Sequence, residues 1–187
     1  MLVLAGILAA VGGLMWLSFA AIGSDNLDAA FGEVGRNRLW TPALFGWLAG
    51  VLIPTVACWR RLSGLIKVGA LFLAAGLLLM LSGNVAEYWF LSDLPHQGPE
   101  GFARGLAWMT FLLGFLVLLL ALPLCGIALL RARAPGWIGA AAIAVTPLTI
   151  GAIFVNLDML VVPLAVLSII MGGYLIAHPR TGGRSGL

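Results

Sequence analysis

The chain has very little charge: ten lysine or arginine residues and seven aspartate or glutamate residues in a length of 187. Only 9% of the residues are charged, against roughly a quarter in ordinary soluble domains, while 62% are hydrophobic and the mean hydropathy is +1.11. A chain this short cannot bury so much apolar surface in water. The composition therefore excludes a soluble enzyme, a nucleic-acid-binding protein and a disordered regulator. It predicts an integral membrane protein whose first partner is the lipid bilayer.

Groups that carry chemistry are also scarce. The two cysteines, Cys58 and Cys125, form no CxxC motif, and the two histidines, His96 and His178, lie outside every long apolar stretch. Intramembrane hydrolases need a nucleophile with a base or a metal-binding helix motif, and no apolar stretch contains either. We therefore expect no enzyme activity, no metal site and no cofactor.

Six apolar stretches are long enough to cross a bilayer, because a helix needs about 20 apolar residues to span roughly 30 Å of hydrocarbon. The stretches are continuous rather than alternating, which favours helices over a barrel. The sequence thus predicts an all-α protein, a six-helix transmembrane bundle that forms one domain over residues 1–187. The predicted spans cover residues 1–23, 41–59, 65–90, 105–130, 137–156 and 159–177.

The charged residues between these spans are sorted by sign. One set of loops and the tail contain only basic residues, whereas the other loops contain all seven acids with three arginines. Because basic loops stay in the cytoplasm, we expect a multi-pass protein of the cell membrane with both termini inside. The polar tail, residues 178–187, is expected to be disordered. The basic side comprises Arg60, Arg61, Lys67, Arg131, Arg133, Arg180 and Arg184, and the acidic side Asp25, Asp28, Glu33, Glu87, Asp93, Glu100 and Asp158 with Arg36, Arg38 and Arg104.

Three segments at or beside the predicted spans need separate predictions. The first apolar run is longer than that of a usual signal peptide and has no basic residue before it, but small residues near Gly23 leave cleavage open. Residues 24–40 have the spacing of a short interfacial helix, with Ser24 at the capping position. Residues 91–104 contain two prolines and two glycines, which favours an irregular loop.

Polar residues end several of the predicted spans on the acidic side. Asn84 and Glu87 lie three residues apart near the end of one span, and Asn156 and Asp158 end another. Residues three apart share a helix face, and ionisable groups within a membrane often mark a solute path. These four residues are candidates for an acidic, outward-facing solute mouth. The alternative is ordinary termination of the helices at the membrane surface.

Pro147 and Thr149 fall near the middle of the predicted span 137–156. Proline removes a backbone donor and tends to kink a helix, so nearby carbonyl groups are freed to meet a solute or a hydroxyl group. The two residues are candidates for a constriction in a solute path. A purely structural kink is the alternative.

Small and aromatic residues in the spans suggest how helices and membrane meet. Gly46 and Gly50 form a GxxxG pattern, which lets two helices approach closely, either inside the bundle or between copies of the chain. Trp16 and Trp47 lie deep in their spans and are expected to pack between helices. Tryptophans near span ends favour the headgroup level, which predicts an anchoring role for Trp40, Trp59, Trp89, Trp108 and Trp137.

Two functions from different classes fit these features. The first is a non-enzymatic membrane subunit or assembly factor that works through helix–helix contacts, with a membrane-protein partner or a second copy of the chain. The second is a channel or transporter for a small solute or a cation, entered through the acidic mouth. The scarcity of polar groups in the spans favours the first, and the acids at their ends favour the second.

Overall fold

The computed structural model describes residues 1–94, 97–132, 135–155 and 157–178, without the side chains at positions 153, 157 and 158. All regular secondary structure in these residues is helical, so the predicted all-α class is confirmed. The long helices are α1 (Leu2–Ile22), α2 (Ser24–Cys58), α3 (Gly64–Val85), α4 (Gly98–Arg131), α5 (Gly136–Ile153) and α6 (Val162–Ala177). Three short elements extend them: the 3-10 helices η1 (Trp59–Arg61) and η3 (Leu157–Val161), and the π-helix η2 (Ala86–Phe90).

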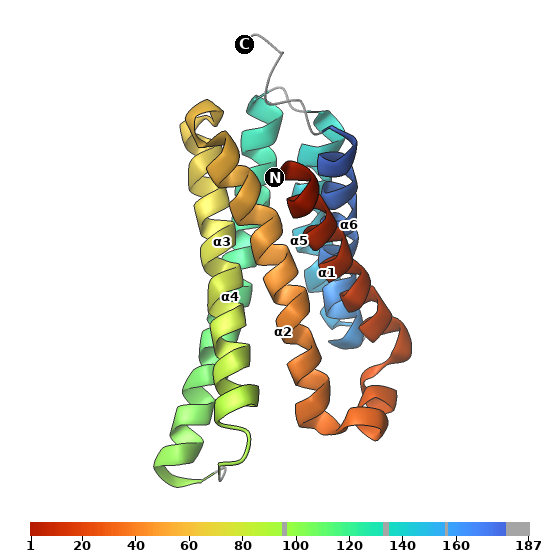
Figure 1. Ribbon diagram of the computed structural model, residues 1–187, viewed down its shortest axis with the longest axis vertical. Helices are drawn as coiled ribbons and strands as arrows, with labels where there is room; N and C mark the ends of the chain where they lie inside the picture. The colour runs from red at the N-terminus through yellow and green to blue at the C-terminus, as the bar shows by residue number, and fades with distance from the viewer. Residues whose placement is uncertain (95–96, 133–134, 156, 179–187) are drawn as a thin grey trace.

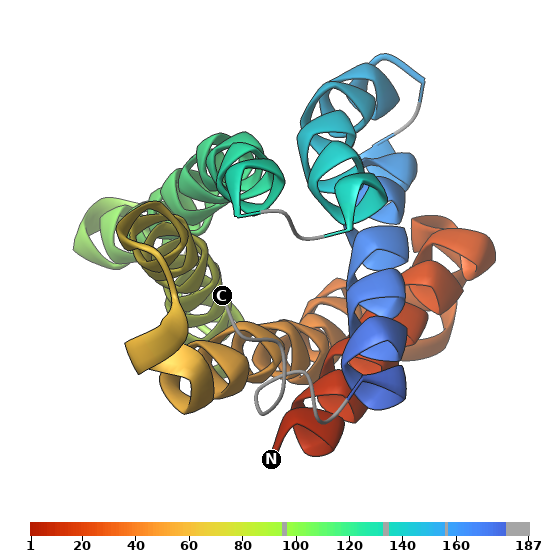
Figure 2. The ribbon, with the colours of Figure 1, turned by 90° about the horizontal axis from the view of Figure 1, so that it is seen from above.

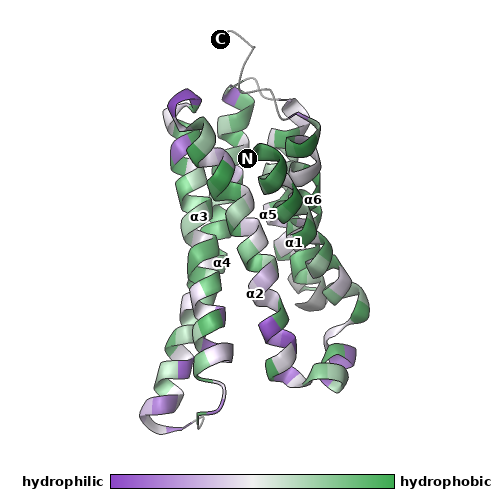
Figure 3. Cartoon of the chain, in the orientation of Figure 1, coloured by the Kyte–Doolittle hydropathy of each residue, from purple (hydrophilic) through white to green (hydrophobic). Residues whose placement is uncertain are grey.

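Five helical segments in the described residues are long and apolar enough to cross a membrane. Figure 3 shows apolar residues along the lengths of the helices and hydrophilic residues gathered at the two ends of the bundle. The structure therefore has the helices of a membrane protein, with five candidate spans where the sequence predicts six. These five are Leu2–Ile22, Ser24–Arg61, Gly64–Phe90, Gly98–Arg131 and Met159–Ala177, while Gly136–Ala152 in α5 is apolar but shorter.

The helices form a ring in the order of the chain (Figures 1 and 2). Each helix contacts the next from α1 to α6, and α6 returns to pack against α1. The most extensive contacts join α3 to α4 and α1 to α6. Successive helices run in opposite directions, so α1 begins and α6 ends at the same end of the molecule (Figure 1).

Glycines at the helix contacts allow this close packing. A Cβ atom added at Gly6 of α1 would lie 2.6 Å from the carbonyl oxygen of Gly172 in α6. One added at Gly114 of α4 would lie 2.6 Å from the carbonyl oxygen of Gly76 in α3. Real Cβ atoms do not approach so closely, so the backbones of both pairs are in contact. In a membrane, where lipid competes for apolar surface, such backbone contact stabilises helix pairs.

Helix α2 begins much earlier than the sequence predicts. It starts at Ser24 and is broken at Gly32, whose φ of 70° and ψ of 162° are not helical, and the residues after the break continue as one helix to Cys58. The predicted span 41–59 is therefore too short, and the predicted interfacial helix 24–40 is confined to residues 24–31. Hydropathy predicts that the span begins after the charged residues Glu33, Arg36 and Arg38. In the structure these residues are already helical and form the first turns after the break.

The other boundaries differ less. Helix α3 with η2 ends at Phe90, as predicted for the span 65–90, while α4 begins at Gly98, so the predicted irregular loop 91–104 is helical in its second half. Pro99 stands in the first turn of α4, where its missing N–H needs no partner. Helix α5 ends at Ile153. Of the predicted disordered tail, only His178 belongs to the described residues.

Candidate functional site

A cavity of about 710 Å³, called here the central cavity, lies inside the ring toward the end where α2 begins and α3 ends. All the helices of the ring except α5 contribute to its lining in the described residues, together with η2 and η3. The lining is mainly apolar and aromatic. Its aromatic members are Trp16, Phe19, Trp40, Trp47, Tyr88, Trp108, Phe111 and Phe115, and its polar members are Ser24, Glu33, Arg36, Asn37, Asn84 and Glu87.

Three tryptophans pack together in one wall of the central cavity. Trp40 and Trp47 lie seven residues apart on α2, which is about two helical turns, so both face α1. The Trp16 ring of α1 lies 4.8 Å from the Trp40 ring and 5.4 Å from the Trp47 ring, between ring centroids. The Trp40 ring also lies 6.0 Å from the Phe111 ring of α4, between ring centroids, so the aromatic cluster reaches a third helix. The expected packing of Trp16 and Trp47 between helices is found here, and Trp40 packs with them rather than standing alone as an anchor.

The indole N–H groups of Trp16 and Trp47 are buried, and in the described part of the chain neither has a hydrogen-bond partner. Trp16 is only 1% exposed, so water does not reach its nitrogen from outside. A buried donor without an acceptor raises the free energy of the folded state, so such donors are uncommon in protein interiors. The wall of the cavity is therefore apolar, with two hydrogen-bond donors that the described protein groups do not satisfy.

Charged residues of both signs lie at the rim of the central cavity. Glu33 and Arg36 come from the start of the long part of α2, and Glu87 comes from η2. Arg36 donates to Asp28 across 2.9 Å, and this is the ion pair found in the described residues. Glu87 interacts electrostatically with Arg104 and with Glu33. The rim thus contains arginines as well as acids. Its charge is therefore less negative than that of a cluster of acids alone.

Asn84 fixes α3 to α2 beside this cavity. Its side-chain amide group donates to the carbonyl oxygen of Asn37 at 3.1 Å, and its oxygen accepts from the Thr41 hydroxyl group at 2.7 Å. The same hydroxyl oxygen accepts from the indole nitrogen of Trp89 at 2.9 Å. Asn84 is 1% exposed, so both of these hydrogen bonds lie in the packed interior. Its amide is therefore engaged in holding two helices together.

Arg38 holds the end of α3 in the same region. Its Nε donates to the carbonyl oxygen of Tyr88 at 2.7 Å, and a terminal nitrogen donates to the Ser92 hydroxyl group at 3.3 Å. The guanidinium group also lies 5.4 Å from the centre of the Trp89 ring. Tyr88 and Trp89 belong to η2, a π-helical turn, and such turns occur often at functional sites.

The predicted site residues are only partly brought together. Asn84 and Glu87 line the central cavity. Asn156 lies outside the described residues, and for Asp158 the structure describes the backbone, in η3, but not the side chain. Pro147 and Thr149 are on α5, and neither is among the described residues that line the cavity.

Thr149 has a different environment from the one predicted. Its side chain is fully buried, and its hydroxyl group has no hydrogen-bond partner in the described residues. The neighbouring Thr146 connects α5 to α4, because its hydroxyl group donates to the carbonyl oxygen of Leu119 at 3.0 Å. Thr149 is thus packed inside the bundle while Pro147 is exposed, and neither lines the central cavity.

The Gly46–Gly50 face packs inside the bundle. A Cβ atom added at Gly46 would lie 2.6 Å from the carbonyl oxygen of Leu8, and one added at Gly50 would lie 2.6 Å from Cβ of Ala9. Both neighbours belong to α1. The structure therefore places this face between α1 and α2 and does not leave it open to another chain.

Several residues of the central cavity are not among the site residues predicted from the sequence. Glu33 and Arg36 belong to the predicted interfacial helix 24–40, and their spacing of three residues places them on one helix face. The position of Trp40 near a span end predicts a membrane anchor, whereas the interval of seven residues to Trp47 aligns the two on one side of a helix. These two spacings are the signals that could have located the cavity wall.

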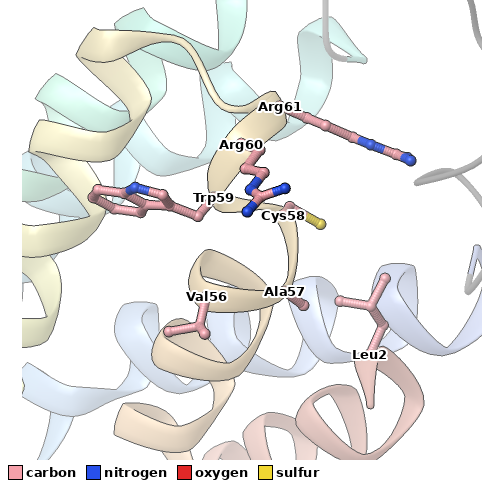
Figure 4. Close-up of a pocket in the computed structure, with 7 residues that line it drawn as sticks. All are labelled: Leu2, Val56, Ala57, Cys58, Trp59, Arg60 and Arg61. Carbon is pink, nitrogen blue, oxygen red and sulfur yellow. The ribbon is translucent and has the colours of Figure 1, made fainter.

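A second cavity, called here the basic pocket, lies at the opposite end of the bundle and has a volume of about 670 Å³ (Figure 4). It lies where α1 begins and α2 ends. Val56 is 70% exposed and Trp59 is 40% exposed, so apolar and aromatic surface lies beside the charged groups. The described residues that line the basic pocket are Leu2, Val56, Ala57, Cys58, Trp59, Arg60 and Arg61.

The described lining of the two cavities brings no cluster of metal ligands together. In the part of the chain that the structure describes, no three histidine, cysteine or acidic residues lie close enough to hold a metal ion. Cys58 and Cys125 are both free thiols. The geometry can therefore support binding of a molecule by apolar contact and a few polar groups.

Comparisons with family models, with curated proteins and with solved structures find no match to this chain.

Proposed function

We propose that the protein crosses the cell membrane six times, with both termini in the cytoplasm, and that it binds a small organic solute in the central cavity and exchanges it with the outer side. The observation that carries the proposal is the central cavity itself, a space of about 710 Å³ with an aromatic wall and a charged rim. Pockets that bind small molecules are commonly about 300–1,000 Å³, mostly apolar, with a few polar groups.

The six-span topology is supported by the ring and by the charges. Helix α5 has 18 residues, which corresponds to about 27 Å of helix and is close to the thickness of the hydrocarbon core. It also connects α4 and α6, which run in the same direction in the ring. Arg60, Arg61 and Arg131 end their helical segments at the end of the molecule where α1 begins, and basic ends stay in the cytoplasm.

The same orientation turns the central cavity outward. Glu33 and Glu87 lie at the end opposite the arginines of η1 and α4, so a rim that contains them faces the outer solution. An inorganic cation would need several oxygen ligands to replace its water, and the cavity wall is mostly apolar. A small organic solute fits this lining better than a metal cation does.

The hypothesis of a membrane subunit finds less support. A partner protein would need a helix face that is open to it, and the Gly46–Gly50 face contacts α1. Exposed apolar side chains on the outside of the ring, such as Leu120 at 74%, are what lipid chains cover in any membrane protein. Binding without catalysis is proposed, in keeping with the mainly apolar and aromatic lining of the central cavity.

The proposal is tested by native mass spectrometry of the protein extracted in patches of its own membrane by an amphipathic polymer. It predicts the chain alone, or copies of it, with one small molecule that stays bound after the lipids are removed. Another polypeptide in fixed proportion, with no such molecule, would instead identify the protein as a subunit of a complex.

A further inference from the structure

We propose that the basic pocket between α1 and α2 is a binding site for one anionic phospholipid, whose phosphate is held by Arg60 and Arg61. The site is separate from the central cavity and lies at the opposite end of the bundle. It is formed because α2 ends at Cys58 and the chain makes one 3-10 turn, which places two consecutive arginines over the start of α1.

Arg60 and Arg61 are exposed and have no acidic partner among the described residues. No ion pair in the described residues involves Arg60 or Arg61, and no acidic residue lies in the sequence between Glu33 and Glu87. Figure 4 shows the Arg60 guanidinium group beside Cys58, and the Arg61 side chain extended from η1. Guanidinium groups match the oxygens of a phosphate group, because their N–H groups form a planar fork.

The surroundings of the two arginines favour a lipid over a free phosphate ion. Leu2, Val56 and Ala57 line the same pocket, so an apolar surface lies directly below the charged groups. Val56 is 70% exposed, and an acyl chain that runs along α2 would cover it. Trp59 stands beside the arginines, as aromatic rings do at the level of the headgroups, with the Lys67 ammonium group 5.1 Å from its ring centre.

The chain offers a matched control for this site. Arg131 ends α4 at the same end of the molecule and is exposed, but it does not line the basic pocket. General attraction of basic residues to an anionic membrane would depend on Arg131 as much as on Arg60. A specific site depends on Arg60 and Arg61 alone.

The experiment measures lipid binding by the purified full chain with native mass spectrometry, using phosphatidylglycerol and phosphatidylcholine with identical acyl chains. We expect one phosphatidylglycerol to bind more tightly than phosphatidylcholine. Arg60→Gln and Arg61→Gln should each weaken that preference about fivefold, since a basic residue near an anionic lipid contributes roughly that factor. Arg131→Gln should leave the preference unchanged, and inorganic phosphate at millimolar concentration should not displace the lipid.

Three results would overturn the inference. Equal effects of the substitutions at positions 60, 61 and 131 would mean diffuse attraction to the membrane surface. Displacement by inorganic phosphate would mean an anion site that does not use the apolar part of the pocket. Equal binding of the two lipids by the unaltered chain would mean no headgroup recognition. Circular dichroism on each variant checks that the helices are intact, and Arg60→Lys, which keeps the charge, should retain most of the preference.

Discussion

Asn84 of α3 donates a hydrogen bond from its side-chain amide group to the backbone carbonyl oxygen of Asn37 on α2, across 3.1 Å. The bond lies at the wall of the central cavity, where both residues are buried. In hydrocarbon no water is available as a hydrogen-bond partner. A hydrogen bond between two helices therefore satisfies a donor and an acceptor that would otherwise be unpaired. The position of α3 relative to α2, and with it the shape of the cavity, depends on this contact.

Replacing Asn84 by alanine should therefore destabilise the bundle. The carbonyl oxygen of Asn37 and the hydroxyl group of Thr41 would each lose a partner in the interior, at a cost of about 1–3 kcal/mol. The free energy of unfolding can be measured by titration with a denaturing detergent. Ser82→Ala is the control, because the exposed Ser82 hydroxyl group bonds only within its own helix, to the Leu79 carbonyl oxygen. An equal loss in both variants would contradict this role of Asn84.

Arg38→Gln should loosen the segment around η2 without unfolding the protein. The guanidinium group bonds to the carbonyl oxygen of Tyr88 and to the Ser92 hydroxyl group, and a hydrogen bond to a charged group contributes about 1.5–3 kcal/mol. Amide hydrogen exchange in residues 86–92 should rise by about tenfold or more, with no change in α6. Lys67→Gln, at the other end of the bundle, should leave the exchange of residues 86–92 as it is.

Gly46→Leu should prevent α1 and α2 from packing. A side chain there meets the carbonyl oxygen of Leu8, and overpacking of this kind costs about 1–3 kcal/mol or more. Gly173→Leu is the matched control, because a Cβ atom on Gly173 of α6 meets no atom within 4 Å. Thermal unfolding in detergent should separate the two variants clearly. If both unfold at the temperature of the unaltered chain, the α1–α2 contact is not as close as described.

The proposed orientation gives a prediction for thiol labelling in intact cells. In a chain with Cys58 and Cys125 replaced by alanine, Glu87→Cys should react with a membrane-impermeant maleimide from outside. Arg61→Cys, at the opposite end, should react only after the membrane is opened. The reverse pattern would place both termini outside.

The limits of sequence-based prediction here follow from what hydropathy measures. The span 65–90 was placed well, because α3 and η2 are apolar over nearly their whole length. The predicted span 41–59 is shorter than α2, because the charged turns that follow Gly32 and precede the apolar stretch are also helical. The central cavity was not foreseen, since it requires Trp16 of α1 to meet Trp40 and Trp47 of α2, and hydropathy does not specify which helices are neighbours.

The most direct test of the account is whether a molecule that copurifies with the protein occupies the central cavity. Ala20 lines that cavity from α1, and its neighbour Ala21 is exposed on the same helix. The account predicts that Ala20→Leu lowers the amount of copurifying molecule per mole of protein by about fivefold or more, because the added side chain occupies its space. Ala21→Leu should leave that amount unchanged. Equal amounts in both variants and in the unaltered chain would contradict binding in the central cavity.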